Sequence, residues 1–262
     1  MNPLGFCSIS ALDRPLAAAA ELVAANGLDG IEVTARAPHL EMGASDADVA
    51  EAAAAVKGAD VAVLTYGSYL GHPPHVTADH ARREAEVAAA LGAPLLRVWA
   101  EPAIGDFDAV VATLRGACDG ADDGTIVVVE RHIGSFADTP DRAERLLDAV
   151  ERPNLALNYQ VLDFLPADLV DAQPDDVRRL VPRAAYFHLK NYRPNPDGGP
   201  LLPGGSLEHG VLDYRALLAA ALDSGYRGPM SIEFLSFEPK TVEEKLAADL
   251  RWLRATLAEL TR

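Results

Sequence analysis

The sequence is poor in cysteine and in basic residues, and it has no long hydrophobic run. Its 262 residues include two cysteines, Cys7 and Cys118, which are too far apart to indicate a disulfide framework or a zinc ribbon. No apolar stretch reaches the roughly 18–20 residues of a membrane-spanning helix. The opening residues, MNPLGFCSIS, lack the basic and apolar regions of a signal peptide. These absences predict a cytoplasmic protein without a membrane partner.

Basic charge is scarce relative to acidic charge. The chain has 23 Lys and Arg against 39 Asp and Glu, a formal net charge of −16. Such a chain repels the nucleic-acid backbone, and no basic stripe with interleaved aromatic residues offsets the repulsion. The composition therefore argues against a nucleic-acid partner, and the simplest role of the charge is to keep the surface soluble.

What the sequence has in quantity is alternation between short β-rich runs and longer segments rich in Ala, Leu, Glu and Arg. Hydrophobic residues make up 49 %, enough for a sizeable core. The predicted strands cover residues 4–9, 30–35, 61–66, 93–100, 125–130, 154–160, 184–190 and 228–234. Helix starts are predicted at Ser45, Thr77, Thr139–Pro140 and Thr241, the last with Glu244 as a capping box. Pro174 is predicted to divide the segment before strand seven into two short helices.

Eight consecutive β/α units predict a parallel sheet, because each crossover helix returns the chain to the same edge. A closed barrel uses all eight strands, and 262 residues is close to its usual length. A doubly wound open sheet is less economical, and there is no Gly-rich dinucleotide loop. We therefore predict a single (β/α)8 TIM barrel with parallel strands over residues 1–262. The longest irregular stretch, residues 193–210, is then a loop on the catalytic face.

Polar side chains occur at the carboxyl ends of the last four predicted strands, which converge on the barrel mouth. They are Glu130, then Asn158 and Gln160, then His188 and Lys190, and finally Glu233. Burying such groups is costly unless they are paired. Two carboxylates, an imidazole and a carboxamide at one point would make a coordination shell for a hard or borderline divalent cation.

Each residue also has a simpler explanation. Glu130 could pair with its neighbour Arg131, Glu233 could pair with Lys240, and His188 could be a hydrogen-bonded structural residue. The coincidence on four consecutive strands favours a joint site. Within strand four, Arg97 is expected to pair with Glu32 or Glu130 across the barrel.

Two aromatic or histidine-bearing segments leave alternatives open. Trp99 is expected to pack in the core, with a sugar-stacking wall as the alternative. The loop of residues 67–75 carries His72 and His75, which are either surface histidines or part of a substrate lid.

The stretch ERHIGSFADTPDRAERLLDAVERPNLALNYQ resembles the middle of the sugar phosphate isomerase/epimerase superfamily, the xylose-isomerase-like TIM barrels. FHLKNY, the LPGG…GVLDY stretch and the closing GYRGPMSIEF are similar to its later segments. The resemblance covers nearly the whole chain and is most specific after strand five. GIEVTAR and RVWAE agree more loosely.

The resemblance implies a single divalent metal ion, Mn²⁺ first, with Co²⁺, Mg²⁺ or Zn²⁺ as alternatives. The implied ligands are Glu130, Gln160, His188 and Glu233. The family usually has Asp where this chain has Gln160, so the site loses one negative charge. A shift of one residue pair along the strand would make Asn158 the ligand instead.

The resemblance further implies an isomerase or epimerase of a small sugar, sugar phosphate or polyol ketone that works through an enediolate. Glu130 and Glu233 would move the proton, and the metal would lower the cost of the enediolate. Lys190 and Arg193 stand where the family places cations beside the substrate. The family's companion polar residue falls at Asp163. These positions, with His132 and Asn158, complete the expected set of substrate-binding residues.

Other functions remain open on the same barrel. One is a dehydratase or lyase acting on keto-inositols, dehydroshikimate or C-glycosides through the same first proton abstraction. Another is a non-catalytic barrel that has lost its metal, which the Gln160 substitution suggests. The superfamily's endonuclease branch for abasic DNA is disfavoured by the acidic charge and the few histidines at strand ends. A homo-oligomer is compatible with the exposed barrel helices, but no residue pattern fixes an interface.

Overall fold

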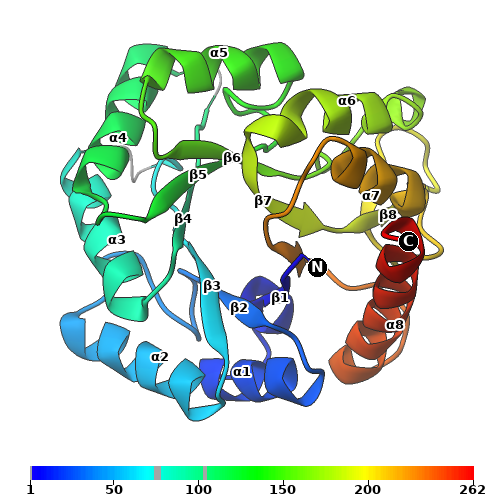
Figure 1. The fold of residues 1–262 in the computed structure, drawn as a ribbon, viewed down its shortest axis with the longest axis horizontal. Coiled ribbons are helices and arrows are strands. Elements are labelled where there is room, and N and C mark those ends of the chain that lie inside the picture. Colours follow the sequence, from blue (N-terminus) through cyan, green and yellow to red (C-terminus); the bar gives the residue numbers. More distant parts are fainter. Residues whose placement is uncertain (1, 74–77, 103–104) are drawn as a thin grey trace.

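Eight parallel strands close into a barrel in the computed structural model, which describes residues 2–73, 78–102 and 105–262 (Figure 1). The strands are β1 (Leu4–Cys7), β2 (Gly30–Thr34), β3 (Ala62–Gly67), β4 (Leu95–Val98), β5 (Ile126–Glu130), β6 (Leu155–Tyr159), β7 (Ala184–Leu189) and β10 (Met230–Ile232). Around the barrel the order is β1-β10-β7-β6-β5-β4-β3-β2, with every pair parallel. The predicted (β/α)8 fold is confirmed.

Helices surround the barrel on its outside (Figure 1). They are α1 (Leu16–Ala25), α2 (Asp46–Gly58), α3 (Ala78–Leu91), α4 (Phe107–Gly120), α5 (Pro140–Val150), α6 (Gln173–Leu180), α7 (Tyr214–Asp223) and α8 (Val242–Leu260), with short 3-10 turns at Ser8–Ala11, Ala167–Leu169 and Val181–Arg183. The caps predicted at Ser45, Thr139 and Thr241 are confirmed, because each side chain accepts a backbone N–H of the first turn. Thr77 lies outside the described residues. Among those residues, no helix is both long and apolar enough to cross a membrane.

Two sequence predictions need correction near strand seven. Pro174 does not divide two helices but lies in the first turn of α6, where its missing N–H has no consequence. The preceding break comes between the 3-10 turn at Ala167–Leu169 and Gln173. The stretch of residues 193–210 is not wholly irregular, because β9 (Leu202–Gly205) pairs antiparallel with β8 (Asn191–Arg193).

The barrel interior changes from apolar to polar along the strands. Leu95, Val128 and Tyr186 form a small apolar cluster that is separate from the main core. Because side chains alternate across a strand, the residues two positions further on point the same way. Those positions hold Arg97, Glu130 and His188. The apolar cluster is therefore the floor on which a layer of charged side chains rests.

Candidate active site and metal centre

The charged layer is almost entirely removed from solvent. Glu130 is 2 % exposed, His188 0 % and Glu233 4 %, and they come from β5, β7 and the residue after β10. Charged groups at this depth are stable only when each has a partner. The contacts of each charged group therefore show which of its atoms are already paired and which are available to a ligand.

Arg97 links two carboxylates beneath the mouth. Its Nε donates to Glu32 Oε1 at 2.9 Å, and its Nη1 donates to Glu130 Oε2. The expected pairing of Arg97 is confirmed with both partners. The pairing of Glu130 with Arg131 is wrong, because Arg131 instead donates to Asp176 at 2.7 Å.

Gln160 holds the other oxygen of Glu130. Its Nε2 donates to Glu130 Oε1 at 2.7 Å and to the Arg131 carbonyl at 2.9 Å. The carboxamide oxygen, Gln160 Oε1, is buried without a hydrogen-bond partner, and so is Asn158 Oδ1. A buried carbonyl oxygen without a donor is unusual, and its lone pairs are open to a cation or another donor. Both residues considered for the fourth metal position thus have a free oxygen.

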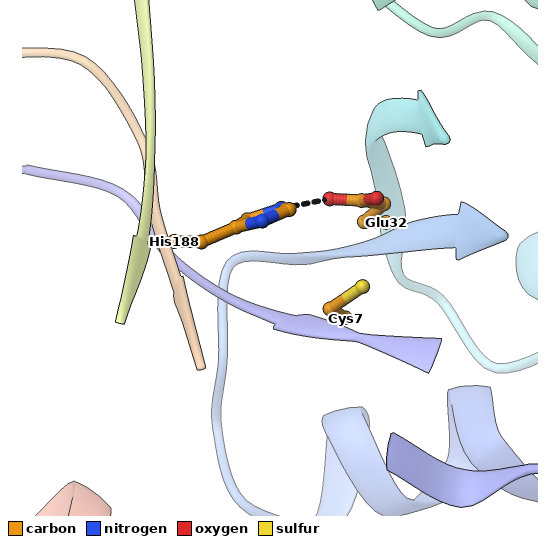
Figure 2. Close-up of side chains that lie close together, drawn as sticks. All are labelled: Cys7, Glu32 and His188. Atoms are coloured by element: carbon orange, nitrogen blue, oxygen red, sulfur yellow. Dashed lines mark hydrogen bonds and ion pairs between the residues drawn. The ribbon is translucent and has the colours of Figure 1, made fainter. Parts of the chain in front are cut away.

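His188 lies between the lower and upper carboxylates. Its Nε2 donates to Glu32 Oε2 at 2.6 Å, and Figure 2 shows the ring pointing at that carboxylate with Cys7 nearby. On the other side, Nδ1 lies 3.3 Å from Asn158 Nδ2 and 3.5 Å from Glu233 Oε1. Burial disfavours the charged ring, but the negative charges of Glu233 and Glu32 outweigh it and raise the pKa of His188.

Lys190 connects the layer to the loop above it. Its Nζ donates to Asp163 Oδ2 at 2.9 Å and lies 3.0 Å from Glu233 Oε2. The second contact is an ion pair without hydrogen-bond geometry, because Glu233 Oε2 has no hydrogen-bond donor. Despite burial, these carboxylates raise the pKa of Lys190, so the amine stays charged. The pairing of Glu233 with Lys240 is wrong, since Lys240 pairs with Glu238.

The residues fit a small divalent cation. Ligand atoms of Glu130, His188 and Glu233 all lie within 4.8 Å of one another. A carboxylate oxygen keeps a lone pair after accepting one hydrogen bond, so Glu130 can still act as a ligand. The free oxygen of Gln160 or Asn158 supplies a fourth donor of the type that Mg²⁺ and Mn²⁺ prefer.

The charge balance also suits such an ion. Four carboxylates, Glu32, Glu130, Asp163 and Glu233, face two permanent cations, Arg97 and Lys190, across the layer. With neutral His188 this leaves two negative charges in excess, which one divalent ion would neutralise.

A second polar cluster at the mouth was not predicted from the sequence. Glu101 accepts hydrogen bonds from the Nδ1 atoms of His132 and His72, the latter at 2.7 Å. Trp99 packs edge-on against His132 with 4.6 Å between ring centroids and stacks on Tyr69 at 5.6 Å. Trp99 is half-buried, and its Nε1 donates to the Ser68 carbonyl at 2.9 Å. The only sequence signal for Glu101 was its position just after strand four, in RVWAE.

The predicted substrate-binding residues divide into two groups. His132 Nε2 lies 3.9 Å from Asp163 Oδ2, which places His132, Asp163 and Lys190 along one edge of the site, and Asn158 contacts His188. Arg193 forms no hydrogen bond or ion pair with the residues of this edge, and its guanidinium lies 5.2 Å from the centre of the Phe237 ring. It forms no ion pair with any residue that the structure describes, and its Nε is buried without a partner. His75, considered as a surface histidine or as part of a substrate lid, lies outside the described residues.

Comparison with known proteins shows the family and the fold. A family model described as xylose isomerase-like TIM barrel matches residues 20–256. A protein of that description from Mycobacterium smegmatis, solved with magnesium, has a TM-score of 0.75 and 18 % identity, covering 100 % of this chain and 98 % of that one. A probable 3-DHS dehydratase from Bacillus anthracis has a TM-score of 0.73 and 20 % identity, covering 97 % and 99 %.

A D-allulose 3-epimerase from Methylomonas sp., solved with D-allulose, has a TM-score of 0.71 and 20 % identity and covers 97 % of both chains. At these identities the similarity shows a common fold. No curated protein sequence matches the chain.

Proposed function

Because the chain belongs to the xylose isomerase-like TIM-barrel family, we propose that it is a divalent-metal-assisted isomerase or epimerase. Its substrate would be a small sugar, sugar phosphate or related polyol ketone. The observation that carries the proposal is the convergence of Glu130, His188 and Glu233, with ligand atoms within 4.8 Å of one another. The Methylomonas epimerase and the magnesium-containing M. smegmatis protein support a sugar substrate and a metal ion in this fold.

The metal ion would be held by Glu130, His188 and Glu233, with Gln160 or Asn158 as the fourth ligand. When bound, it supplies Lewis acidity that lowers the energy of an oxyanion formed on the substrate. The two carboxylates come from β5 and from the end of β10, which lie on different sides of the barrel. One would remove the proton beside the carbonyl, and the other would return it.

Lys190 and Asp163 would act on the substrate next to Glu233. Lys190 touches Glu233 Oε2 and is kept charged by its two carboxylate neighbours. Its ammonium group can donate to an enediolate oxygen, which stabilises the negative charge that develops there. His132, held by Glu101, presents Nε2 toward Asp163 and would bind a substrate hydroxyl.

Solvent exchange at the carbon beside the carbonyl tests the proposal before the substrate is known exactly. The Mn²⁺-loaded protein is incubated in D₂O with a panel of ketoses, keto-inositols and keto-glycosides, and products are analysed by mass spectrometry. Uptake of one deuterium with a change in configuration or carbonyl position is expected. Loss of water with an enone absorbance would instead make the protein a dehydratase, the activity of the B. anthracis neighbour.

Variants assign the exchange to the site. Glu130→Gln and Glu233→Gln should abolish deuterium uptake, because each removes a proton carrier. Glu238→Gln is the matched control, since Glu238 is an exposed glutamate in the loop after β10. No exchange with any substrate of the panel, or full exchange in both site variants, would contradict the proposed function.

A further inference from the structure

We infer that Glu32 is a positioning residue that keeps a proton on Nε2 of His188 and so leaves Nδ1 as the nitrogen offered to the metal ion. The inference deepens the proposed function and rests on it for its consequence. The geometry itself is independent of activity. Glu32 lies on β2, far in the sequence from the strand-end residues of β5 to β10, in the segment GIEVTAR that agrees only loosely with the family.

The Nε2 side of the ring has one clear acceptor. Nε2 lies 2.6 Å from Glu32 Oε2, and a carboxylate can only accept, so the nitrogen must carry the proton (Figure 2). Both atoms are fully buried, so water does not compete for that proton. A neutral imidazole has only one N–H, so Nδ1 then carries the lone pair.

The Nδ1 side has the environment that this tautomer requires. The amide Nδ2 of Asn158 lies 3.3 Å from Nδ1 and donates to its lone pair. Nδ1 also faces the carboxylates that would share the metal, with Glu233 Oε1 at 3.5 Å. Glu32 thus holds the proton on Nε2, and a metal ion shared with Glu233 would take the lone pair of Nδ1.

Glu32 is itself held rigidly. Its other oxygen, Oε1, accepts from Arg97 Nε at 2.9 Å, and burial of the carboxylate is outweighed by His188 and Arg97, which lower the pKa of Glu32 to about 2. The ring of Tyr186 packs edge-on against His188 with 5.0 Å between centroids, which restricts rotation of the imidazole. A buried carboxylate with one oxygen on Arg97 and the other on His188 is suited to orient a histidine ligand.

Cys7 makes the same region resemble a second metal site, but its chemistry does not fit one. Cys7, Glu32 and His188 also place ligand atoms within 4.8 Å of one another. However, burial and the nearby Glu32 and Glu233 charges raise the pKa of the Cys7 thiol well above its ordinary value. A metal ligand must be the thiolate, and the nitrogen of His188 on this side, Nε2, carries the proton donated to Glu32 and has no lone pair to offer. Cys7 and Glu32 therefore do not form a second metal site with His188, and Glu32 instead orients the His188 ring.

Nuclear magnetic resonance of the ring nitrogens tests the inference directly. The ¹⁵N-labelled protein is measured metal-free and saturated with diamagnetic Mg²⁺, and His188 is assigned among the seven histidines by comparison with His188→Asn. With Mg²⁺ we expect a protonated Nε2 and an unprotonated Nδ1 that shifts on metal binding. A proton on Nδ1 together with a metal-dependent shift of Nε2 would overturn the inference.

Two variants separate positioning from packing. In Glu32→Gln the amide can donate or accept, so the Nε2–H preference should be lost and Mg²⁺ affinity should fall roughly 10–100-fold. Cys7→Ala removes the third member of the cluster, which makes no hydrogen bond to His188, and should leave the tautomer unchanged. An unchanged tautomer in folded Glu32→Gln would refute the role of Glu32. Nε2–H without deuterium exchange on any substrate would refute the proposed function alone.

Discussion

Removing Arg97 should be among the most destabilising single changes in the barrel interior. Arg97 is 1 % exposed, and it is the cation that joins Glu32 to Glu130. Arg97→Met keeps most of the side-chain volume but leaves two buried carboxylates without that cation. Breaking a buried ion pair in this way costs about 3–5 kcal/mol. At about 2–4 °C per kcal/mol for a chain of this size, the melting temperature should fall by roughly 6–20 °C.

Urea unfolding followed by circular dichroism measures the loss, and two further variants control it. Arg152→Met removes a surface arginine paired with Asp119 and should leave the unfolding midpoint unchanged within error. Adding Glu32→Gln to Arg97→Met should recover part of the loss, because one unpaired charge is removed. An Arg97→Met protein within about 1 kcal/mol of wild type would refute the view that this layer depends on charge pairing.

Three further outcomes follow from the pKa shifts and contacts. Burial raises the pKa of Asp249 to about 6, although its carboxylate accepts a hydrogen bond from the Leu207 N–H, so the native state loses stability as pH rises from about 4 to 6. In thermal unfolding, Asp249→Asn should be as stable as wild type near pH 4 and more stable at pH 8, by up to about 3 kcal/mol. The hydrogen bond to Glu101 outweighs burial and raises the pKa of His132. Glu101→Gln should therefore lower the pKa of His132 in an NMR titration, and an unchanged pKa would contradict the pairing of Glu101 with His132. Lys190→Met should reduce kcat/KM roughly 10²–10³-fold, because an enediolate oxygen loses its ammonium donor. Calorimetry should show unchanged or tighter metal binding, because the site gains negative charge, and weaker metal binding would contradict the role of Lys190 beside the substrate.

The strand pattern was enough to predict the barrel because parallel strands buried on both faces have long apolar runs. IVVVE in β5 is an example, with Val127 and Val129 packed against the helices and Val128 inside the barrel. The same alternation predicted that Glu130 and His188 face the mouth. The β8–β9 pairing in the loop after β7 was missed, because Gly204 and Pro203 are weak strand residues.

The sequence alone could not predict which charged side chains of the site pair with one another. Arg131 is the sequence neighbour of Glu130, but alternation sends it to the outside of the barrel, where it meets Asp176. Glu32 was expected only as one partner of Arg97, and its contact with His188 spans 156 positions. Such pairs depend on the shear of the closed barrel, which the sequence does not display.

Metal stoichiometry tests the central claim most directly. The protein is purified without added metal and titrated with Mn²⁺, and bound metal is measured by elemental analysis after gel filtration. The site formed by Glu130, His188 and Glu233 predicts one tight equivalent per chain. That equivalent should be lost in His188→Ala and kept in His209→Ala, which alters an exposed histidine. No stoichiometric metal, or an equivalent that persists in His188→Ala, would contradict the account.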